Sequence, residues 1–548
     1  MLDTRMMPFS LSVTHLLERG RAIHPGSEVV SRLPDKSLHR QTYRDTYERS
    51  ERLAKALTRL GIGRGDRVAT LSWNHRQHLE AYLGVPAMGA VVHTLNLRLF
   101  PAEIGYIANH ADDKAVIVDR TLFPLFEKFR HEVKSLRHVL CVRDDGGPLP
   151  DGALDYEVLL AEEAPTARPD GFGPPAGSPF FHPDEQAAAM VCYTSGTTGN
   201  PKGVAYTHRS TVLHALVASM RDNLGVGADD VVMPVVPMFH AAAWGLPYVA
   251  WVNGAKVVFP GPHLDPESLL DLMQAERVTF AAGVPTIWNG ILAKLDAEPK
   301  RWDLSAMRTM VIGGSAAPPA MIRGFAERHG LLVTHAWGMT ETNPLGTVAS
   351  VKANVAERGA DAVLHARSSQ GLPVAFVETR HVDERGAIMP WDGKTMGELE
   401  VRGPWVARSY MGDEGPDRFT ADGWFKTGDV VTIDGDGYVR ITDRSKDVIK
   451  SGGEWISSVA LENALMSHPS VLEAAVFARE DSKWGERPVA AIVLRPDQEV
   501  TEKELEGHLA PHFVKYWLPD SYVFVPEIPR TSTGKFLKSK LREEYGKS

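Results

Sequence analysis

Cysteine is almost absent from this sequence: Cys141 and Cys192 are the two cysteines among 548 residues, and both lie in apolar runs. Two cysteines in so long a chain cannot form the disulfide framework of a small secreted protein. The sequence therefore favours a reducing compartment, and we expect a cytoplasmic location.

Long hydrophobic runs and an excess of positive charge are also missing. No apolar run reaches the ~18 residues that a membrane-spanning helix needs. The first residues include Asp3, and the pair Glu18 and Arg19 follows, which does not fit a signal peptide. The formal net charge is −9 and no basic stripe is present, which argues against a nucleic-acid partner. A nucleotide is not excluded, because it needs only local positive groups.

Glycine and hydroxyl residues are instead concentrated in residues 193–203, YTSGTTGNPKG. Glycines such as Gly196 and Gly199 let the backbone turn its N–H groups onto an anion. Further donors and a positive charge come from Thr194, Ser195, Thr197, Thr198 and Lys202. Residues 187–192 are typical of a buried strand and residues 207–220 of a helix, so strand, Gly-rich loop and helix predict a phosphate site. It is not a Walker A loop, and a mobile linker is the alternative.

Strands and helices alternate through most of the chain. Helices are predicted at residues 40–61, 75–88, 101–110 and 266–275, and strands at 67–72, 90–95, 114–119, 230–236, 256–259, 278–283, 309–314 and 332–336. Apolar strands that alternate with helices predict a parallel, doubly wound α/β fold. In such sheets ligands bind outside the carboxyl ends of the strands. The ends at residues 313–314 and 336–337 and the Gly-rich loop are therefore expected to line one crevice.

The pattern changes at about residue 370, where alternating strands such as 397–402 and 437–442 predict a β-rich, barrel-like subdomain. A charged cluster at residues 443–447 then opens a last segment with strands and helices of its own. We place a domain boundary there. The expected architecture is a large α/β N-terminal domain of doubly wound sheets, residues 1–442, with its β-rich part at about 370–442, and a small α/β C-terminal domain, residues 443–548.

Five motifs stand in the order found in the adenylate-forming superfamily, which the chain resembles over almost its whole length. They are residues 193–203, 337–341 (WGMTE), 423–429 (GWFKTGD), 443–453 (DRSKDVIKSGG) and 529–535 (PRTSTGK). The superfamily includes acyl-CoA synthetases, nonribosomal-peptide adenylation domains and firefly luciferase. Residues 238–244 (MFHAAAW) and 452–457 (GGEWIS) are most similar to bacterial medium- and long-chain fatty acyl-CoA synthetases.

The resemblance implies an AMP-forming fatty acid–CoA ligase that uses ATP, Mg²⁺ and coenzyme A. A carboxylate attacks the α-phosphorus of ATP, which releases pyrophosphate and leaves an acyl-adenylate. The thiol of coenzyme A then displaces AMP. A carboxylate needs no general base, but its approach to a triphosphate must be screened by cations and fixed donors.

The resemblance also implies which residues act in adenylation. Lys535 is expected to reach the carboxylate and the α-phosphate from a mobile C-terminal domain; a surface lysine is the alternative. Glu341 is expected to bind Mg²⁺ with Thr194 on the same side, since Mg²⁺ prefers few carboxylates plus phosphate oxygens. Thr340 is expected to reach the α-phosphate. For Glu341, a carboxylate stabilised by a helix N-terminus is a compatible alternative.

The nucleotide site is expected to use two strand ends and one turn. The adenine slot is implied to consist of Gly314, Ser315 and Ala316 on one side and of His335, Ala336 and Trp337 on the other. Most relatives have Tyr where Trp337 stands; Trp keeps the stacking face but lacks the hydroxyl, and a core aromatic is the alternative. Asp429 is the expected ribose ligand, although turn chemistry alone also explains an Asp there. Arg444 and Lys446 are expected to add ribose and phosphate contacts.

Coenzyme A and the acyl chain are assigned to other residues. Asp443 is the expected hinge about which the C-terminal domain rotates. Rotation is implied to present the pantetheine channel, formed by Gly452 and Gly453 and flanked by Lys450 and Trp455; a hairpin glycine pair is the alternative. The acyl pocket is assigned to His240, Trp244 and Gly338. Trp244 stands among small residues, and this pattern fits a tunnel gated by the indole ring as well as it fits a packed core helix.

Two other functions fit the same motifs. One is a CoA ligase for a short or sulfur-containing acid such as methylmercaptopropionate, and the other is a free-standing adenylation enzyme that loads a carrier protein. A homodimer is expected from the relatives. The sequence determines neither the chain length of the acid nor the thiol acceptor.

Overall fold

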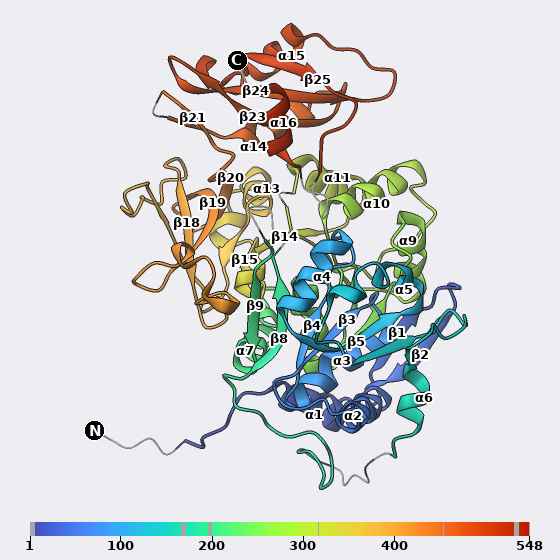
Figure 1. The fold of residues 1–548 in the computed structure, drawn as a ribbon. Helices are drawn as coiled ribbons and strands as arrows, with labels where there is room; N and C mark the ends of the chain where they lie inside the picture. Colours follow the sequence, from blue (N-terminus) through green and yellow to red (C-terminus); the bar gives the residue numbers. More distant parts are fainter. Residues whose placement is uncertain are drawn as a thin grey trace.

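Two large sheets that pack through a shared core of helices and tyrosines form most of the molecule (Figure 1). The computed structural model describes residues 6–164, 166, 171–194, 200–315, 317–452, 454–530 and 536–546. In that part of the chain, no helix combines the length and apolarity needed to cross a membrane. Both cysteines are buried and free.

The first large sheet has seven strands. Their order is β7 (Leu154–Asp155), β6 (His138–Val142), β5 (Asp113–Asp119), β3 (Arg67–Leu71), β4 (Val91–Thr94), β8 (Ala188–Tyr193) and β9 (Gly203–Thr207). All neighbours are parallel except β8 and β9, which pair antiparallel. The expected order of strand, Gly-rich loop and helix is thus wrong in one respect: the loop joins two strands of a hairpin. Helix α7 (His208–Ala218) begins only after β9, where the Thr207 side chain caps it by accepting from the N–H of Ser210.

The second large sheet has nine strands. Their order is β16 (Leu372–Pro373), β15 (Leu345–Val348), β14 (Val333–Gly338), β13 (Thr309–Ile312), β12 (Phe280–Gly283), β10 (Val231–Pro234), β11 (Lys256–Phe259), β1 (Glu28–Arg32) and β2 (Leu38–Thr42). The strands from β14 to β1 are parallel, and the outermost pairs are antiparallel. The predicted doubly wound α/β class is therefore confirmed.

Helices of the N-terminal region cover these sheets (Figure 1). Their bounds are α1 (Val13–Ile23), α2 (Tyr43–Arg59), α3 (Arg76–Ala87), α4 (Pro101–His110), α5 (Phe123–Phe126), α6 (Tyr156–Ala161), α8 (Leu246–Asn253), α9 (Pro266–Ala275), α10 (Pro285–Ala297), α11 (Pro319–His329), α12 (Ala353–Ala356) and α13 (Ala360–Ser368). Helix α2 starts later than residue 40, because residues 38–42 form β2 and Thr42 forms a capping box with Asp45.

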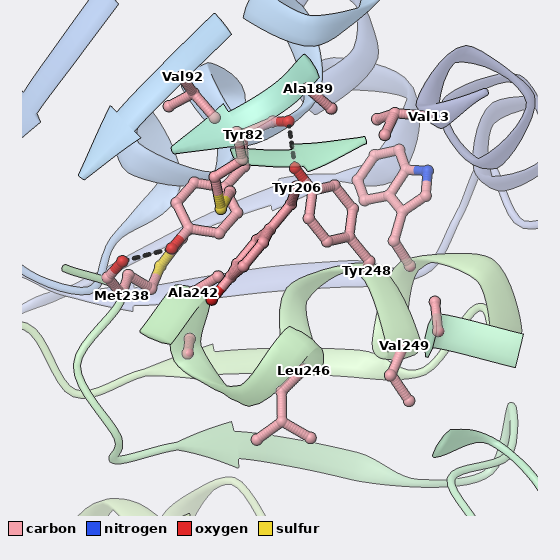
Figure 2. Packing of buried hydrophobic residues seen from close by; sticks show 14 of the residues in the cluster. Val13, Tyr82, Val92, Ala189, Tyr206, Met238, Ala242, Leu246, Tyr248 and Val249 are labelled. Carbon is pink, nitrogen blue, oxygen red and sulfur yellow. Dashed lines mark hydrogen bonds between the residues drawn. The ribbon is translucent and has the colours of Figure 1, made fainter. Parts of the chain in front are cut away.

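Buried tyrosines lie between the first sheet and the segment that leads into α8. Figure 2 shows the Tyr82 phenol directed at the carbonyl of Met238 and the Tyr248 phenol directed at the carbonyl of Tyr82. The second bond is 2.8 Å long. These phenols satisfy buried carbonyl groups that would otherwise lose their solvation. They thereby link the two ends of residues 238–248, which include the predicted acyl-pocket residues His240 and Trp244, to Tyr82 of α3.

Two smaller sheets complete the chain. An antiparallel sheet has the order β17 (Glu378–Val382), β18 (Gly397–Arg402), β19 (Phe425–Ile433) and β20 (Val439–Arg444). It matches the predicted β-rich subdomain. The last sheet contains β22 (Glu454–Ile456), β21 (Ile449–Ser451), β24 (Gly485–Leu494) and β23 (Val471–Asp481), with β25 (Ser521–Phe524) paired to β24. Helices α14 (Ser458–Met466), α15 (Glu502–Leu509) and α16 (Lys538–Tyr545) pack on it, and together they form the separate upper body in Figure 1.

Candidate active site

The carboxyl ends of β13 and β14 bring the predicted adenine and acyl residues together. After β13 ends, Gly313 has no room for a side chain: a Cβ there would lie 2.8 Å from the carbonyl oxygen of Ala336 and 2.9 Å from Cη2 of Trp244. Gly314 follows with a φ of +83°, a conformation that glycine adopts without strain. The Trp244 ring, the glycine turn and the end of β14 therefore share one wall.

Trp337 and Asp429 are joined by a direct hydrogen bond. The indole Nε1–H donates to Oδ2 of Asp429 at 3.0 Å, and both side chains are buried. Oδ1 lies 2.9 Å from Nε of Arg444, an ion pair, yet it accepts no hydrogen bond from any described residue. A buried carboxylate oxygen without a donor is a place where a ligand hydroxyl would bind. Trp337 thus donates to Asp429 through its indole N–H. A Tyr at this position would have only its phenol hydroxyl as a donor.

His335 lies in β14 beside Ile312 of β13 and is almost fully buried. Burial lowers its pKa to about 4. Its Nδ1 has no hydrogen-bond partner among the described residues. The ring is therefore neutral at neutral pH.

The phosphate side of the site is built from the ends of β8 and β9 and from the short helix η4 (Thr340–Thr342). Thr194 and Lys202 close the Gly-rich loop: the N–H of Thr194 donates to the carbonyl of Lys202 at 3.0 Å, and the N–H of Lys202 donates to Oγ1 of Thr194 at 3.1 Å. Tyr206 of β9 donates to the carbonyl of Thr340 at 2.7 Å. Glu341 follows and is buried. The hairpin and the predicted metal carboxylate are thus neighbours.

The donor set around Glu341 fits Mg²⁺. Among the described residues, only its Oε1 takes part in a hydrogen bond, which it accepts from Tyr410 at 2.6 Å. In the described part of the chain the other carboxylate oxygen accepts no hydrogen bond, so it is available to a ligand. No group of three or more His, Cys, Asp or Glu suited to a metal occurs in the described part of the chain. A site with a single carboxylate suits Mg²⁺, which keeps waters and phosphate oxygens as its other ligands.

The predicted acyl segment is not a regular core helix. Residues Ala241–Gly245 form a short turn, η3, whose φ angles run from +38° to +73°. A left-handed turn of this kind costs roughly 1–2 kcal/mol for each residue with a Cβ. Such strain is characteristic of functional segments. His240 precedes the turn, and Trp244 is carried on it toward Gly313.

Gly338 ends β14 and is sterically obligatory. A Cβ at this position would lie 1.9 Å from the carbonyl oxygen of Pro344. The N–H of the next residue, Met339, donates to the same oxygen at 3.1 Å. Gly338 therefore permits the tight return of the chain that places Thr340 and Glu341.

The residues predicted to guide coenzyme A lie elsewhere. Lys450 pairs with Glu384 at 2.5 Å and lies 5.8 Å from the ring centroid of Trp455. The N–H of Gly452 donates to the carbonyl of Trp484 at 2.7 Å. In Figure 1, β21 lies on the outer side of the upper body, away from β14. The structure does not bring these residues to the nucleotide site.

Asp443, the predicted hinge, is buried inside β20. It accepts from the N–H of Arg444 at 2.7 Å and from the N–H of Ser458 at 2.6 Å. Burial raises its pKa. Lys446 lies three residues after Asp443, and burial lowers the pKa of its ammonium group. The backbone carbonyl of Lys446 accepts a hydrogen bond from the Arg542 side chain at 3.4 Å. The hinge position thus connects β20 to the first turn of α14.

Some predicted site residues lie outside the described residues, and their roles stay predictions. They are Ser195, Gly196, Thr197, Thr198, Gly199, Ala316, Gly453 and Lys535. Conversely, sequence reasoning missed Tyr206 and Tyr410. Tyr206 belongs to the strand β9 that the sequence did not predict, and the short run of Val204, Ala205 and Tyr206 gives only a weak strand signal. Tyr410 lies in a loop without periodicity, where no local pattern marks it.

Comparison with known proteins identifies the family of this chain. The AMP-binding enzyme family matches residues 17–411, and the AMP-binding enzyme C-terminal domain matches residues 460–535. A long-chain-fatty-acid–CoA ligase of Thermus thermophilus is 48% identical over 98% of this chain and 96% of that protein. A medium-chain-fatty-acid–CoA ligase of Ectopseudomonas oleovorans is 42% identical over 99% and 97%. A 3-methylmercaptopropionyl-CoA ligase of Ruegeria pomeroyi is 42% identical over 99% and 98%.

A solved structure extends the likeness to the fold. The anthranilate CoA ligase AuaEII in complex with anthranoyl-AMP has a TM-score of 0.84 at 26% identity and covers 99% of this chain and 98% of that one. The family model spans well over half of the chain, and the Thermus relative aligns with nearly all of it. The chain therefore belongs to the AMP-binding enzyme family, within the adenylate-forming superfamily that its motifs resemble.

Proposed function

We propose that this protein is an AMP-forming ligase that activates a medium- or long-chain fatty acid with ATP and transfers the acyl group to coenzyme A. The observation that carries the proposal is the proximity of Trp244 to Gly313 and Ala336 and the hydrogen bond between Trp337 and Asp429, which support a nucleotide site beside the proposed acyl segment. The similar fatty-acid–CoA ligases support the choice of acid.

In the first half-reaction, this chain's residues bind and orient the nucleotide. The flat adenine lies against the glycine turn and Trp337, and Oδ1 of Asp429, which is ion-paired with Arg444 but accepts no hydrogen bond from a described residue, accepts from the ribose diol. The loop closed by Thr194 and Lys202 holds the pyrophosphate that leaves. Bound Mg²⁺ supplies charge to screen the triphosphate, and Glu341 with Thr194 would hold it. Lys535 neutralises the approaching carboxylate and the α-phosphate.

In the second half-reaction, the last segment turns about Asp443. The proposed domains are residues 1–442 and 443–548, with the β-rich part at about 370–442. Rotation withdraws Lys535 and brings Gly452, Gly453, Lys450 and Trp455 to the site, where two glycines leave a narrow path for the pantetheine arm. Lys446 and Arg444 follow the hinge and contact the ribose and phosphate. We also propose that the enzyme is cytoplasmic and forms a homodimer.

A second acid is favoured by a specific observation. The Ruegeria relative named for 3-methylmercaptopropionate aligns over the full chain with the same identity as the medium-chain relative. A small sulfur-containing acid would fill only the part of the pocket nearest Trp244.

Separate assays of the two half-reactions test the proposal. Lys535→Ala should abolish formation of acyl-adenylate, measured as pyrophosphate release, while transfer from preformed acyl-adenylate to coenzyme A stays largely intact. Lys540→Ala is the matched control, because this exposed lysine lies on α16. Equal loss of both half-reactions in the Lys535 variant would contradict its assigned role.

A further inference from the structure

The loop between β18 and β19 contacts Glu341, the predicted metal ligand, at both its main-chain carbonyl and its carboxylate. The N–H of Ala407 donates to the carbonyl of Glu341 at 2.7 Å, and the Tyr410 hydroxyl donates to Oε1 of Glu341 at 2.6 Å. Tyr410 is 4% exposed although it lies in a loop. Its phenol is therefore fixed by its surroundings, and it fixes one of the two carboxylate oxygens in turn.

The ring of the same tyrosine contacts Lys202, the lysine of the Gly-rich loop. Nζ of Lys202 lies 5.2 Å from the centroid of the Tyr410 ring, within the range of a cation–π contact. Gly415 has a φ of +55°, and a Cβ there would lie 2.7 Å from Nζ of Lys202 and 3.6 Å from Cδ2 of Tyr410. Lys202 thus packs against both the tyrosine ring and a glycine that leaves room for it.

The loop has two more contacts with the hairpin β8–β9. Met411 lies against Gly203, where a Cβ would come within 2.8 Å of the Met411 sulfur. Glu414 lies 3.8 Å from His110, whose Nδ1 is 2.7 Å from the hydroxyl of Tyr193. Both ends of the Gly-rich loop, at Tyr193 and at residues 202–203, are therefore held by residues 410–415.

The chemistry of the contact fixes Tyr410 as the donor. An ionised carboxylate can only accept a hydrogen bond, so the phenol hydroxyl donates to Oε1 of Glu341. A hydrogen bond to a charged group is worth more than one between neutral groups, so the orientation of Glu341 depends on this contact.

We propose that Tyr410 is a positioning residue of the adenylation site: its hydroxyl orients Glu341 toward the metal while its ring holds Lys202 toward the phosphates. One side chain thereby sets the metal carboxylate and the phosphate lysine relative to each other. The inference rests on the proposed function, because it assigns to Glu341 and Lys202 the Mg²⁺ and the phosphates of ATP.

Two substitutions separate the two contacts. Tyr410→Phe removes the hydroxyl and keeps the ring, whereas Tyr410→Leu removes both. Tyr438→Phe is the matched control, because this buried tyrosine donates to the carbonyl of Ser350 at 2.8 Å, in contact with the backbone rather than with a site carboxylate. Each variant is compared with the unmodified full chain, and its far-ultraviolet circular dichroism and thermal midpoint establish that it is folded.

The readout is nucleotide binding, measured by calorimetry with a non-hydrolysable ATP analogue over a range of Mg²⁺ concentrations. Tyr410→Phe should raise the Mg²⁺ concentration for half-maximal binding about tenfold, as the loss of one hydrogen bond to a charged group predicts. Binding of the analogue without Mg²⁺ should change little. Tyr410→Leu should weaken binding both with and without Mg²⁺, and the added effect should disappear in a Lys202→Met background.

An unchanged Mg²⁺ dependence in a folded Tyr410→Phe variant would overturn the inference, as would equal losses in the two variants. Failure of the proposed function is a different result: the unmodified protein would then show no Mg²⁺-dependent binding of the analogue.

Discussion

Replacing Lys538 by methionine should destabilise the last segment more than any other single change of a charged residue on α16. Lys538 begins this helix and is buried, with Nζ 2.6 Å from Oε1 of Glu462 and 2.5 Å from Oγ of Ser458. Ser458 in turn donates its N–H to Asp443. The lysine is therefore the cation for two buried carboxylates.

The pKa shifts show how unfavourable the buried charges of these two carboxylates would be without Lys538. Burial raises the pKa of Glu462 to about 7 although the charge of Lys538 lowers it. Burial lowers the pKa of Lys538, but the charges of Glu462 and Asp443 outweigh this and raise it. Lys538 is thus protonated, and Lys538→Met leaves a buried carboxylate cluster without its cation. Removing one partner of a buried ion pair costs about 3–5 kcal/mol.

Thermal unfolding followed by circular dichroism measures this cost. For a segment the size of residues 443–548, a loss of 3 kcal/mol corresponds to a shift of about 10 °C or more in the midpoint of its transition. Limited proteolysis identifies that transition with the last segment. Lys540→Met, an exposed change on the same helix, should stay within about 0.5 kcal/mol. The double variant Lys538→Met and Glu462→Gln should recover part of the loss, because it removes the Glu462 charge and leaves that of Asp443, which still accepts from the N–H groups of Arg444 and Ser458. The reasoning is refuted if the single variant matches the unmodified protein or the double variant is no better than the single one.

Two further predictions follow from the nucleotide wall and the buried histidines. Trp337→Phe keeps an aromatic face but removes the indole donor to Asp429, so we expect AMP affinity, measured by calorimetry, to fall roughly tenfold; an unchanged affinity would show that the Trp337–Asp429 bond does not orient the ribose carboxylate. Burial lowers the pKa to about 3 for His78 and to about 4 for His208, His214 and His335. The folded pKa values of these histidines lie below the unfolded value of about 6.5. Their contribution to the free energy of unfolding is therefore complete above pH 6.5 and is lost as the pH falls toward 4. Each histidine accounts for up to about 3 kcal/mol of this loss. The urea midpoint should be constant above pH 7 and fall steeply below pH 6, and a midpoint that stays level down to pH 4.5 would contradict this.

The sequence was most informative where local patterns and tertiary structure agree. Apolar strands such as β5 and helices such as α4 occur within a residue of their predicted bounds, because burial on both faces leaves a clear composition signal. The class of enzyme followed from motifs, whose residue types are dictated by phosphate chemistry rather than by packing.

The features that were missed depend on contacts between distant parts of the chain. Strand β9 is only five residues long and leads directly into the cap of α7, so the following helix pattern concealed it. The left-handed turn at Ala241–Gly245 runs against the preference of alanine, and only its packing against the sheets makes it stable. Tyr410 gains its role from Glu341, 69 positions earlier, which no local pattern reveals.

The central claim is tested most directly by an activity assay of the purified protein with ATP, Mg²⁺ and straight-chain acids from acetate to octadecanoate. Each acid is supplied with and without coenzyme A, and the AMP, pyrophosphate and acyl-CoA formed are quantified. 3-Methylmercaptopropionate is included as the competing acid. We expect sustained turnover only with coenzyme A, with AMP and acyl-CoA formed in equal amounts and the highest rates for medium- or long-chain acids. Turnover that does not depend on coenzyme A would identify a carrier-protein loader instead, and turnover confined to the shortest acids or to 3-methylmercaptopropionate would contradict the assigned substrate.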